Sequence, residues 1–485
     1  MDMMTAVKVS EKIRTKALGC EEYMTYVVDR IDRLNPTLNA IVAMLDGDDL
    51  IALARKADTD LARGDYQGWL HGMPHAVKDL SNVAGFVTSF GSPIFADTVA
   101  QADDVFVSRI RSEGAIFIGK TNVPEFGLGS QSYNPVYGAT GNAFDASLTA
   151  GGSSGGAAVA LATGMLPVAD GSDMMGSLRN PAAYNNVVGF RPSLGRVPKD
   201  KQELFFDQLP IEGPMGRTVE DVICLFETMA GADAGSPLSQ QPAPASLSQY
   251  KKADLSDVRI GWLGSYDGHL AFDPGVISLC EKALEQTAAA GGRVEAIRIP
   301  FDYDSLWKTW LTLRHWFVAN SRRGLYANEN HRRQLKSELI WEIEQGANVT
   351  AADVYDAGVN RSNWFRVLNE AFVKYDILAL PSAQAFPFSL DQHWPTSVGG
   401  RPMDTYHRWM EVTIGATLSG CPVISLPAGF DDSTASDGGK DGNAKRAMGI
   451  QFIAPIGKDR ELLEFALAYQ DSNNWFDAYP ADDIF

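Results

Sequence analysis

Apolar residues follow two different spacings along the chain, and the two alternate. Helices are predicted where apolar residues recur every three to four positions, at 21–34, 50–63, 103–113, 217–226 and 274–290. Buried strands are predicted where a short apolar run is bounded by Gly, Pro or charge, at 115–120, 258–263, 293–299, 376–382, 421–430 and 448–455. This alternation predicts an α/β fold.

The segment 301–410 departs from that alternation because it has a helical pattern throughout. It holds seven of the ten tryptophans: Trp307, Trp310, Trp316, Trp341, Trp364, Trp394 and Trp409. Two polar stretches are predicted to be irregular, an exposed connection at 234–255 and a surface loop at 431–445. No internal repeat is found.

Composition and charge exclude several classes of protein. The 485 residues are 45% hydrophobic and 21% charged, which is typical of a globular chain, and the net charge is -18. Nucleic-acid binding needs clustered Lys and Arg, so the acidic balance argues against it. The chain shows neither a signal-peptide pattern nor an apolar run of the ~18 residues that a membrane helix needs. Cytoplasmic location and no membrane partner are therefore expected.

The cysteines and histidines give no sign of a metal or disulfide site. The four cysteines, Cys20, Cys224, Cys280 and Cys421, have no close spacing, so buried reduced thiols are expected. No His, Asp or Glu cluster has metal-ligand spacing, which argues against a metal-dependent enzyme. No metal and no cofactor are predicted.

Three segments carry candidate chemistry. Lys78 follows the apolar approach HGMPHAV, and a lysine buried there has its charged form disfavoured. The run GGSSGG (151–156) precedes a helix-forming stretch, so its glycines allow unusual backbone conformations beside a helix N-terminus. In VADGSDMMGSLRNPA (168–182), an apolar strand leads into a turn that contains Ser177. Taken singly, each segment has an ordinary explanation. Lys78 could be an exposed lysine, GGSSGG a flexible loop, and Ser177 an exposed serine in a turn.

The three segments together provide a nucleophile and a base. A serine hydroxyl needs a base to take its proton, and none of the seven histidines sits in a recognisable triad motif. The G-x-S-x-G motif of α/β-hydrolases is not the pattern around Ser177. A lysine of lowered pKa can act as base, and two adjacent serines can relay the proton.

The order of the motifs resembles the amidase signature family. The matching motifs are VKDL, GKTNVPEFG, GGSSGGAAVALA, GSDMMGSLRNPA, VGFRPSLGRV, GPMGRTVEDV and GCPVISLPAGF. The resemblance spans about residues 20–470, with a signature core at 70–230. It implies a single amidase-signature domain over 1–485, with a mixed β-sheet core covered by helices.

The resemblance also implies a role for each matching residue. Lys78 would be the base, Ser153 the bridging serine in a cis peptide, and Ser177 the nucleophile, 24 positions after Ser153. The backbone N–H groups that would form the oxyanion hole are those of Met174, Met175, Gly176 and Ser177. Supporting roles fall to Ser154, Asp173 and Arg179, and substrate-lining positions to Gly127, Leu128 and Gly129.

One position departs from the family pattern. The family usually has two glycines before the nucleophile, whereas this chain has Met175 at the first of them. If that position needs a positive φ, Met175 is strained. If it does not, Met175 adds apolar wall to the pocket.

The predicted activity is hydrolysis of small or aromatic amides through a serine acyl-enzyme. Carbamate or ester hydrolysis uses the same residues and stays open. The A subunit of aminoacyl-tRNA amidotransferase belongs to a related group, but the tryptophan-rich segment favours apolar substrates over glutamine. A catalytically inactive binding protein on this fold is disfavoured because Lys78, Ser153 and Ser177 are all present.

The predicted partner is a small-molecule amide, and the chain is expected to be a monomer or homodimer. Tryptophans at helical spacing lie in the core more often than in a pocket. We nevertheless expect one or two of the seven to line the substrate cavity, because specificity in the family varies in this part of the chain.

Overall fold

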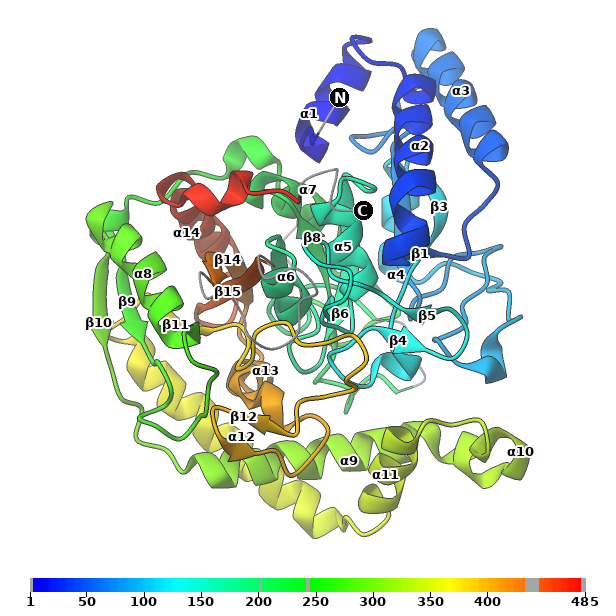
Figure 1. Cartoon of the computed structure of the whole chain (residues 1–485). Coiled ribbons are helices and arrows are strands. Elements are labelled where there is room, and N and C mark those ends of the chain that lie inside the picture. The colour runs from blue at the N-terminus through cyan, green and yellow to red at the C-terminus, as the bar shows by residue number, and fades with distance from the viewer. Residues whose placement is uncertain (1–2, 200–202, 241–244, 432–444, 481–485) are drawn as a thin grey trace.

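An eight-stranded mixed sheet runs through the middle of the molecule (Figure 1). The computed structural model describes residues 3–199, 203–240, 245–431 and 445–480. In sheet order the strands are β10 (Arg293–Ala296), β9 (Arg259–Trp262), β11 (Ile377–Pro381), β15 (Arg446–Ile453), β14 (Val423–Asp431), β7 (Val188–Arg191), β8 (Ile211–Gly216) and β6 (Val168–Asp173). The first three are parallel, and every later pair is antiparallel.

A smaller sheet lies beside the β6 edge of the large one. It has the order β1 (Ile41–Val42), β3 (Ile116–Thr121) and β2 (Pro74–Lys78), with β2 parallel to β3. All five residues of β2 are buried, which explains its apolar pattern. The backbone N–H of Lys78 donates to Asp170 Oδ2 on β6 at 3.2 Å, so β2 ends between the two sheets.

Helices cover both faces of the large sheet. Successive residues of a strand point to opposite faces. On β15, Gln451 accepts a hydrogen bond from Arg179 of α6 (Arg179–Tyr184), whereas Phe452 packs against Phe465 of α14 (Asp459–Ser472), with ring centroids 4.9 Å apart. The helices α6 and α14 therefore lie on opposite faces. The predicted mixed sheet covered by helices is confirmed.

The other helices around the two sheets match the predicted positions, except α1 (Ala6–Arg14), which was not predicted. The helices that match are α2 (Cys20–Leu38), α3 (Gly47–Arg63), α4 (Val105–Ser112), α5 (Gly155–Ala162), α7 (Val219–Met229) and α8 (Val276–Ala289). At the start of α7, the Thr218 side chain accepts from the Asp221 N–H, as the sequence pattern indicates. The helix α2 continues past the predicted end at Leu34 and through Pro36, because Leu38 is still fully buried.

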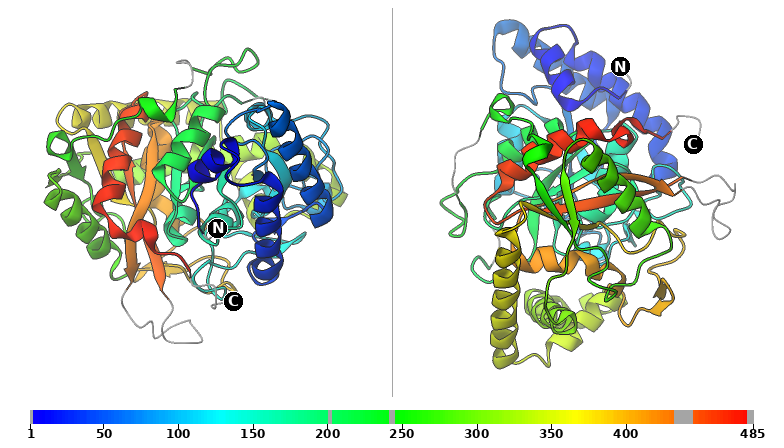
Figure 2. Two further views of the ribbon diagram at one scale, coloured as in Figure 1. Left: turned by 90° about the horizontal axis from the view of Figure 1, so that it is seen from above. Right: turned by 90° about the vertical axis from the view of Figure 1, so that its left-hand side faces the viewer.

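The helices of the segment 301–410 form a layer below the sheet in the side view of Figure 2. The helical prediction is wrong between 373 and 407, because Ile377–Pro381 forms β11 of the large sheet. The other elements of the segment are α9 (Tyr303–Ala327), α10 (Glu329–Arg332), α11 (Ser337–Gly346), α12 (Ala351–Phe372), β12 (Ser397–Val398), β13 (Arg401–Pro402) and the 3₁₀ helix η5 (Arg408–Thr413), which runs into α13 (Ile414–Ser419). Four of the seven tryptophans are buried: Trp307, Trp310, Trp364 and Trp409. These four belong to the core, as their helical spacing favours.

Short elements complete the chain. They are β4 (Tyr133–Asn134), β5 (Gly138–Ala139) and the 3₁₀ helices η1 (Pro93–Phe95), η2 (Glu125–Gly127), η3 (Leu247–Gln249), η4 (Leu255–Asp257) and η6 (Asn474–Asp477). The predicted exposed connection at 234–255 contains η3. The predicted loop at 431–445 lies almost entirely outside the described residues.

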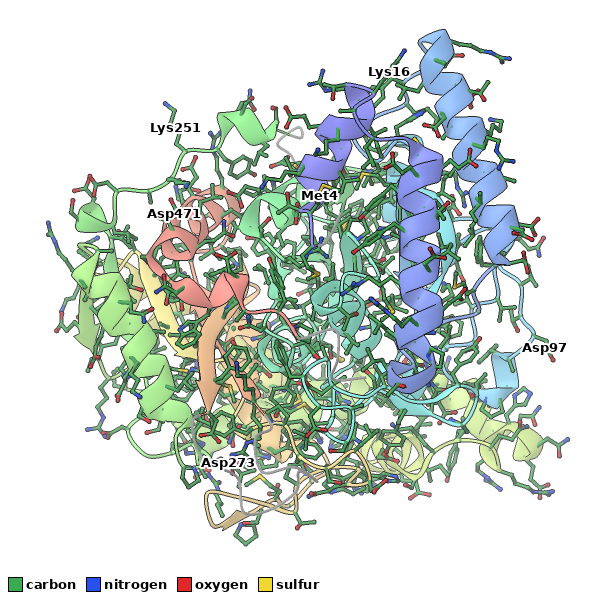
Figure 3. All side chains as sticks on the ribbon, turned by 45° about the horizontal axis from the view of Figure 1, so that its top comes forward. Met4, Lys16, Asp97, Lys251, Asp273 and Asp471 are labelled. Atoms are coloured by element: carbon green, nitrogen blue, oxygen red, sulfur yellow. The ribbon has the colours of Figure 1, made fainter. Side chains whose placement is uncertain are left out.

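Many charged side chains are exposed at the surface. Lys16, Asp97, Lys251 and Asp471 are exposed, and Figure 3 shows them at the outside of the molecule. Among the described helices, none combines the length and the apolar character needed to cross a bilayer.

Trp364 ties α12 to α13. Its side chain is 1% exposed, and its Nε1 donates to the carbonyl oxygen of Gly415 at 2.7 Å. We predict that Trp364→Ala lowers the free energy of unfolding by about 3–5 kcal/mol, because it leaves a cavity and an unpaired carbonyl. Urea unfolding followed by circular dichroism measures the shift.

The matched control is Tyr355→Ala on the same helix, where the side chain is 73% exposed. Its unfolding midpoint is expected to stay close to that of the wild type. Equal midpoints for the two variants would contradict the role assigned to Trp364.

Candidate active site

The Lys78 amine is enclosed by serine oxygens. The side chain is 1% exposed at the end of β2. Its Nζ lies 2.8 Å from Ser153 Oγ and 2.7 Å from Ser154 Oγ. On β6, Ser172 adds its Oγ at 3.0 Å and its carbonyl oxygen at 3.2 Å. The amine therefore has four oxygen partners, and no carboxylate of the described residues is in direct contact with it.

Burial sets the protonation of this amine. Desolvation lowers the pKa of Lys78 to about 7, although the negative charges of Asp170, Asp173 and Glu212 oppose the shift. A large share of the amine is consequently neutral near pH 7, and a neutral amine can accept a proton.

Ser153 lies at the turn between an extended loop and α5. The Gly152–Ser153 peptide is cis, as the family resemblance implies, and Ser153 is 2% exposed. A Cβ on Gly152 would lie 2.9 Å from the backbone nitrogen of Gln131, so this position has no room for a side chain. The GGSSGG run is thus a tightly packed loop that places both serines on the lysine.

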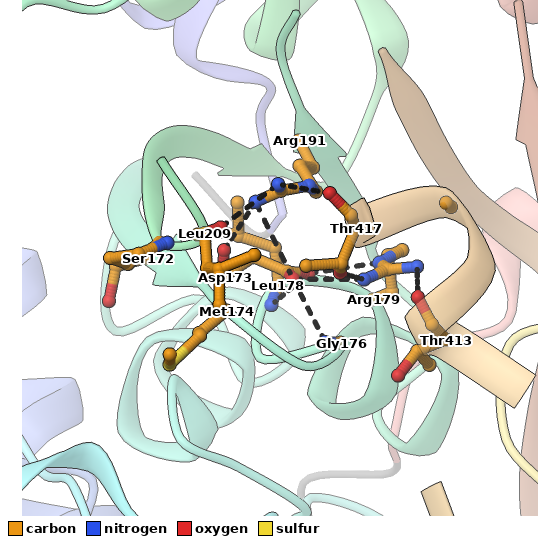
Figure 4. Close-up of polar contacts among 12 residues, drawn as sticks. Ser172, Asp173, Met174, Gly176, Leu178, Arg179, Arg191, Leu209, Thr413 and Thr417 are labelled. Carbon is orange, nitrogen blue, oxygen red and sulfur yellow. Dashed lines mark hydrogen bonds and ion pairs between the residues drawn. The ribbon is translucent and has the colours of Figure 1, made fainter. Parts of the chain in front are cut away.

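The turn that contains Ser177 is built around the Asp173 carboxylate (Figure 4). Asp173 accepts from the N–H of Gly176 at 2.9 Å and from the N–H of Leu178 at 3.1 Å. Arg179 donates to both oxygens of the same carboxylate at 2.9 Å, in the bidentate geometry that favours this pair. Asp173 and Arg179 are fully buried, as is the carboxylate's second cationic neighbour, Arg191.

This buried ion pair also connects distant parts of the chain. Burial alone would raise the pKa of Asp173, but the Arg179 and Arg191 charges hold it well below its usual range. Arg179 Nη1 donates to the Thr413 carbonyl oxygen at 3.0 Å and to Gln451 Oε1 at 2.8 Å. The turn is therefore held from α6, η5 and β15 at once (Figure 4).

The backbone N–H groups around Ser177 differ in whether they already donate a hydrogen bond. The Gly176 N–H donates to Asp173. Within the described part of the chain, the N–H groups of Met174, Met175 and Ser177 have no hydrogen-bond acceptor. The Ser177 side chain is 6% exposed, and no hydrogen bond joins its hydroxyl to that of Ser153 among the described contacts. Three of the four predicted oxyanion donors are therefore unengaged.

Met175 is not strained. Its φ is not positive, and its side chain is 3% exposed in the main apolar core. The positive φ of +84° falls on Gly176, where a Cβ would meet Thr413 Cγ2 at 2.6 Å. Met175 therefore adds apolar contacts and not backbone strain. Of the two positions before Ser177, only the second, Gly176, requires glycine.

The three predicted substrate-lining residues occupy different environments. A Cβ on Gly127 would lie 3.6 Å from Ser153 Oγ, and one on Gly129 would lie 4.0 Å from the Tyr406 ring. Leu128 instead packs in an apolar cluster with residues of α9 and α11. Gly127 and Gly129 thus lie along a path from Ser153 to Tyr406, whereas the Leu128 side chain is core.

Several residues near the lysine were not found from the sequence. Asp170 and Ser172 both contact Lys78 from β6, and Asp170 Oδ1 also lies 3.0 Å from His75 Nε2. The sequence did contain a sign of Asp170 and Ser172. They are polar residues at alternate positions of an apolar strand, so their side chains point to the same face. Among the described residues, no group of three or more His, Cys, Asp or Glu side chains is arranged to hold a metal.

Comparisons with known proteins agree with this architecture. The chain matches the family model described as Amidase over residues 22–463. It is 31% identical to an acylamidase of Rhodococcus erythropolis, over 99% of this chain and 98% of that protein. It is also 31% identical to the A subunit of the glutamyl-tRNA(Gln) amidotransferase of Symbiobacterium thermophilum, over 99% of each chain.

A solved structure gives the same result. A bacterial aryl acylamidase of the amidase signature family superposes with a TM-score of 0.88 at 26% identity, over 98% of each chain. The match extends through the sheet, the serine loops and the helical layer, so the chain belongs to the amidase signature family and is an amide-hydrolysing enzyme.

Proposed function

We propose that Ser177 is the nucleophile of an amidase in which neutral Lys78 acts as base through Ser153. The observation that carries the proposal is the 2.8 Å contact of Lys78 Nζ with Ser153 Oγ inside a site that lowers the lysine pKa to about 7. A serine hydroxyl needs such a base, and a buried lysine supplies one without histidine.

The first half-reaction forms an acyl-enzyme. Lys78 takes the Ser153 proton while Ser153 takes the Ser177 proton, after the Ser177 hydroxyl turns toward Ser153. Ser177 Oγ then bonds to the amide carbon, and the carbonyl oxygen becomes an oxyanion. The unengaged N–H groups of Met174, Met175 and Ser177 stabilise that charge, at about 2.7–4 kcal/mol for one donor.

Acylation is complete when the C–N bond breaks, as Ser153 gives a proton to the leaving nitrogen and is itself reprotonated by Lys78. In the second half-reaction, water loses a proton through the same relay and attacks the acyl carbon. The C–Oγ bond then breaks, and the relay returns that proton to Ser177. Asp173 and Arg179 do not touch the substrate; they hold the turn that presents Ser177 and the three N–H groups.

The substrate class is small or aromatic amides. The similarity to an acylamidase and an aryl acylamidase supports this class, as do the tryptophans around Tyr406, where the Trp341 and Trp394 rings lie 5.9 and 6.1 Å away. Carbamates and esters pass through the same acyl-enzyme and are part of the proposed range.

Glutamine is the second candidate substrate, favoured by the 31% identity to the A subunit of an amidotransferase. A panel of aryl amide, aliphatic amide, carbamate, ester and glutamine separates the two candidates. We predict that kcat/KM for the aryl amide is at least about tenfold above that for glutamine. Burial of the apolar aryl group against the tryptophan-rich layer favours binding of the aryl amide. Faster release of ammonia from glutamine would contradict the aryl-amide proposal.

Removal of the proposed nucleophile or base is the direct test. We predict that Ser177→Ala and Lys78→Ala each lower kcat for an aryl amide by at least about a thousandfold, because each abolishes one step of the relay. Release of the aniline followed by absorbance measures the loss. A fluorophosphonate probe, detected by mass spectrometry of peptides, is expected to label Ser177 in the wild type.

The matched control is Ser112→Ala, which removes an exposed serine hydroxyl on α4. It is expected to keep wild-type kcat and probe labelling. Labelling at another serine, or more than about a tenth of wild-type activity in Ser177→Ala, would refute the assignment.

The lysine pKa predicts the pH dependence. Because the neutral amine is the active form, kcat/KM should rise with pH through about 7 and level off above it. Glu212 raises the Lys78 pKa, so Glu212→Gln is expected to move the rising limb to lower pH. Profiles of kcat/KM between about pH 5 and 9 measure both effects. A limb that moves to higher pH in Glu212→Gln would contradict Lys78 as the base.

A further inference from the structure

Three buried side chains in the helical layer form a closed hydrogen-bonded triangle. Arg314 of α9 donates through Nε to Glu342 Oε1 of α11 at 2.5 Å, and through Nη2 to Tyr406 Oη at 2.7 Å. Tyr406 Oη in turn donates to Glu342 Oε1 at 2.7 Å. Glu342 also accepts from His315 Nδ1 at 2.6 Å. Arg314 is 4% exposed and Glu342 is fully buried, so the triangle holds the guanidinium in one orientation.

The triangle borders both loops of the active site. Arg314 Nη1 lies 3.7 Å from the Sδ of Met174, whose backbone N–H is a proposed oxyanion donor. Figure 4 shows the Met174 side chain pointing away from Arg179. The Tyr406 ring lies against Gly129. Gly129 is two positions along the chain from Gly127, which lies beside the Ser153 hydroxyl. Arg314 therefore contacts the turn that contains Ser177, and Tyr406 contacts the 127–129 segment beside Ser153.

One arm of the guanidinium has no oxygen partner. Nε and Nη2 have strong acceptors, but the only contact of Nη1 among the described residues is the Met174 thioether, which is a weak acceptor. A buried guanidinium N–H without a good acceptor is costly, so this arm favours an acceptor supplied by a bound molecule.

Further unpartnered polar atoms lie close to Arg314 and Tyr406. Trp307, Trp310 and Arg314 share one face of α9, since they are three and four residues apart. Within the described part of the chain, Trp307 Nε1, Trp310 Nε1 and both ring nitrogens of His407 have no hydrogen-bond partner, and all are buried. The His407 ring lies 4.6 Å from the Tyr406 ring and 5.3 Å from the Trp307 ring. Buried polar atoms of this kind need a partner from water or a ligand.

We propose that Arg314, held by Glu342 and Tyr406, is a specificity residue that donates through Nη1 to a neutral oxygen acceptor on the substrate, away from the bond that is cleaved. This inference rests on the proposed function and names its substrate class: aryl or acyl amides that carry an ether, carbonyl or similar uncharged oxygen. The Trp341 and Trp394 rings beside Tyr406 provide the apolar surroundings, and the substrate oxygen replaces the Met174 thioether as the acceptor of Nη1.

The charge around Arg314 favours a neutral acceptor over an anion. Burial would raise the pKa of Glu342, but the Arg314 charge holds it well below its usual range, so the carboxylate is ionised. Arg314 is consequently neutralised within the protein. A substrate carboxylate would add a second buried negative charge beside Glu342, which is unfavourable.

The test compares substrates that differ only by an oxygen in place of a methylene. One pair varies the acyl side, methoxybutanoyl anilide against hexanoyl anilide, and the other varies the amine side, para-methoxyanilide against para-ethylanilide of the same acid. The variant is Arg314→Met with Glu342→Gln, which removes the donor without leaving a buried charge. We predict that the ratio of kcat/KM for the ether to that for the alkyl substrate falls about tenfold in the double variant, in one of the two pairs. A fall of this size corresponds to the loss of one hydrogen bond from a charged donor.

Two controls separate this role from a structural one. Arg323→Met removes an exposed arginine from the same helix and is expected to keep the wild-type ratio. Arg314→Lys keeps the charge beside Glu342 but lacks the planar fork, so its ratio should fall as in the double variant. It also keeps the test decisive if the double variant does not fold.

Binding makes the outcomes distinguishable. Calorimetry on the Ser177→Ala protein compares the ether and alkyl compounds of each pair by their dissociation constants, without turnover. A ratio that is equal in wild type and both Arg314 variants would overturn the role of Arg314, and so would tighter binding of a carboxylate analogue, glutaryl anilide. Ether-selective binding without hydrolysis by the wild type would instead sink the proposed function and leave this inference standing.

Discussion

The burial of one lysine amine is the constraint on which the active site depends. Lys78 ends a strand whose residues are all buried, and its Nζ hydrogen-bonds only to serine oxygens among the residues that the structure describes. Removing the amine from water disfavours its charge, and hydroxyl groups compensate that loss less than a carboxylate in contact would. The two sheets therefore meet at this buried amine. Strand β6 places Asp170 and Ser172 beside Lys78 and ends at Asp173, where the turn that contains Ser177 begins.

A second buried charge has the opposite function. Asp173 keeps its charge because Arg179 and Arg191 surround it, and its oxygens organise the backbone on either side of Ser177. Breaking such a pair leaves an uncompensated buried charge, so the turn is rigid by construction. The helical layer reaches the same turn from below through the Arg314–Glu342–Tyr406 triangle and Met174. Two separate buried charge networks thus meet at one turn.

Much of the fold could be predicted from the sequence because apolar spacing reports burial directly. Most of the long helices and six of the eight strands of the large sheet fall where the pattern predicts them, within a few residues at most ends, whereas β7, β8 and α14 were not predicted. The pattern failed where burial continued past a local stop signal: α2 runs through Pro36 because Leu38 still packs in the core. The residues proposed for catalysis were found through motif order, since a lone lysine and a turn serine carry no local sign of their environment.

By itself, the sequence determined the alternation of helices and strands, the family, and the residue types available for catalysis. Local spacing and motif order encode these, and neither depends on contacts between distant segments. Only the tertiary structure decided that Met175 is unstrained, that the Gly176 N–H is already engaged by Asp173, and that Arg314 faces Met174 from 140 positions away. Hydrogen-bond partners and desolvation are properties of the assembled core, and a linear pattern does not contain them.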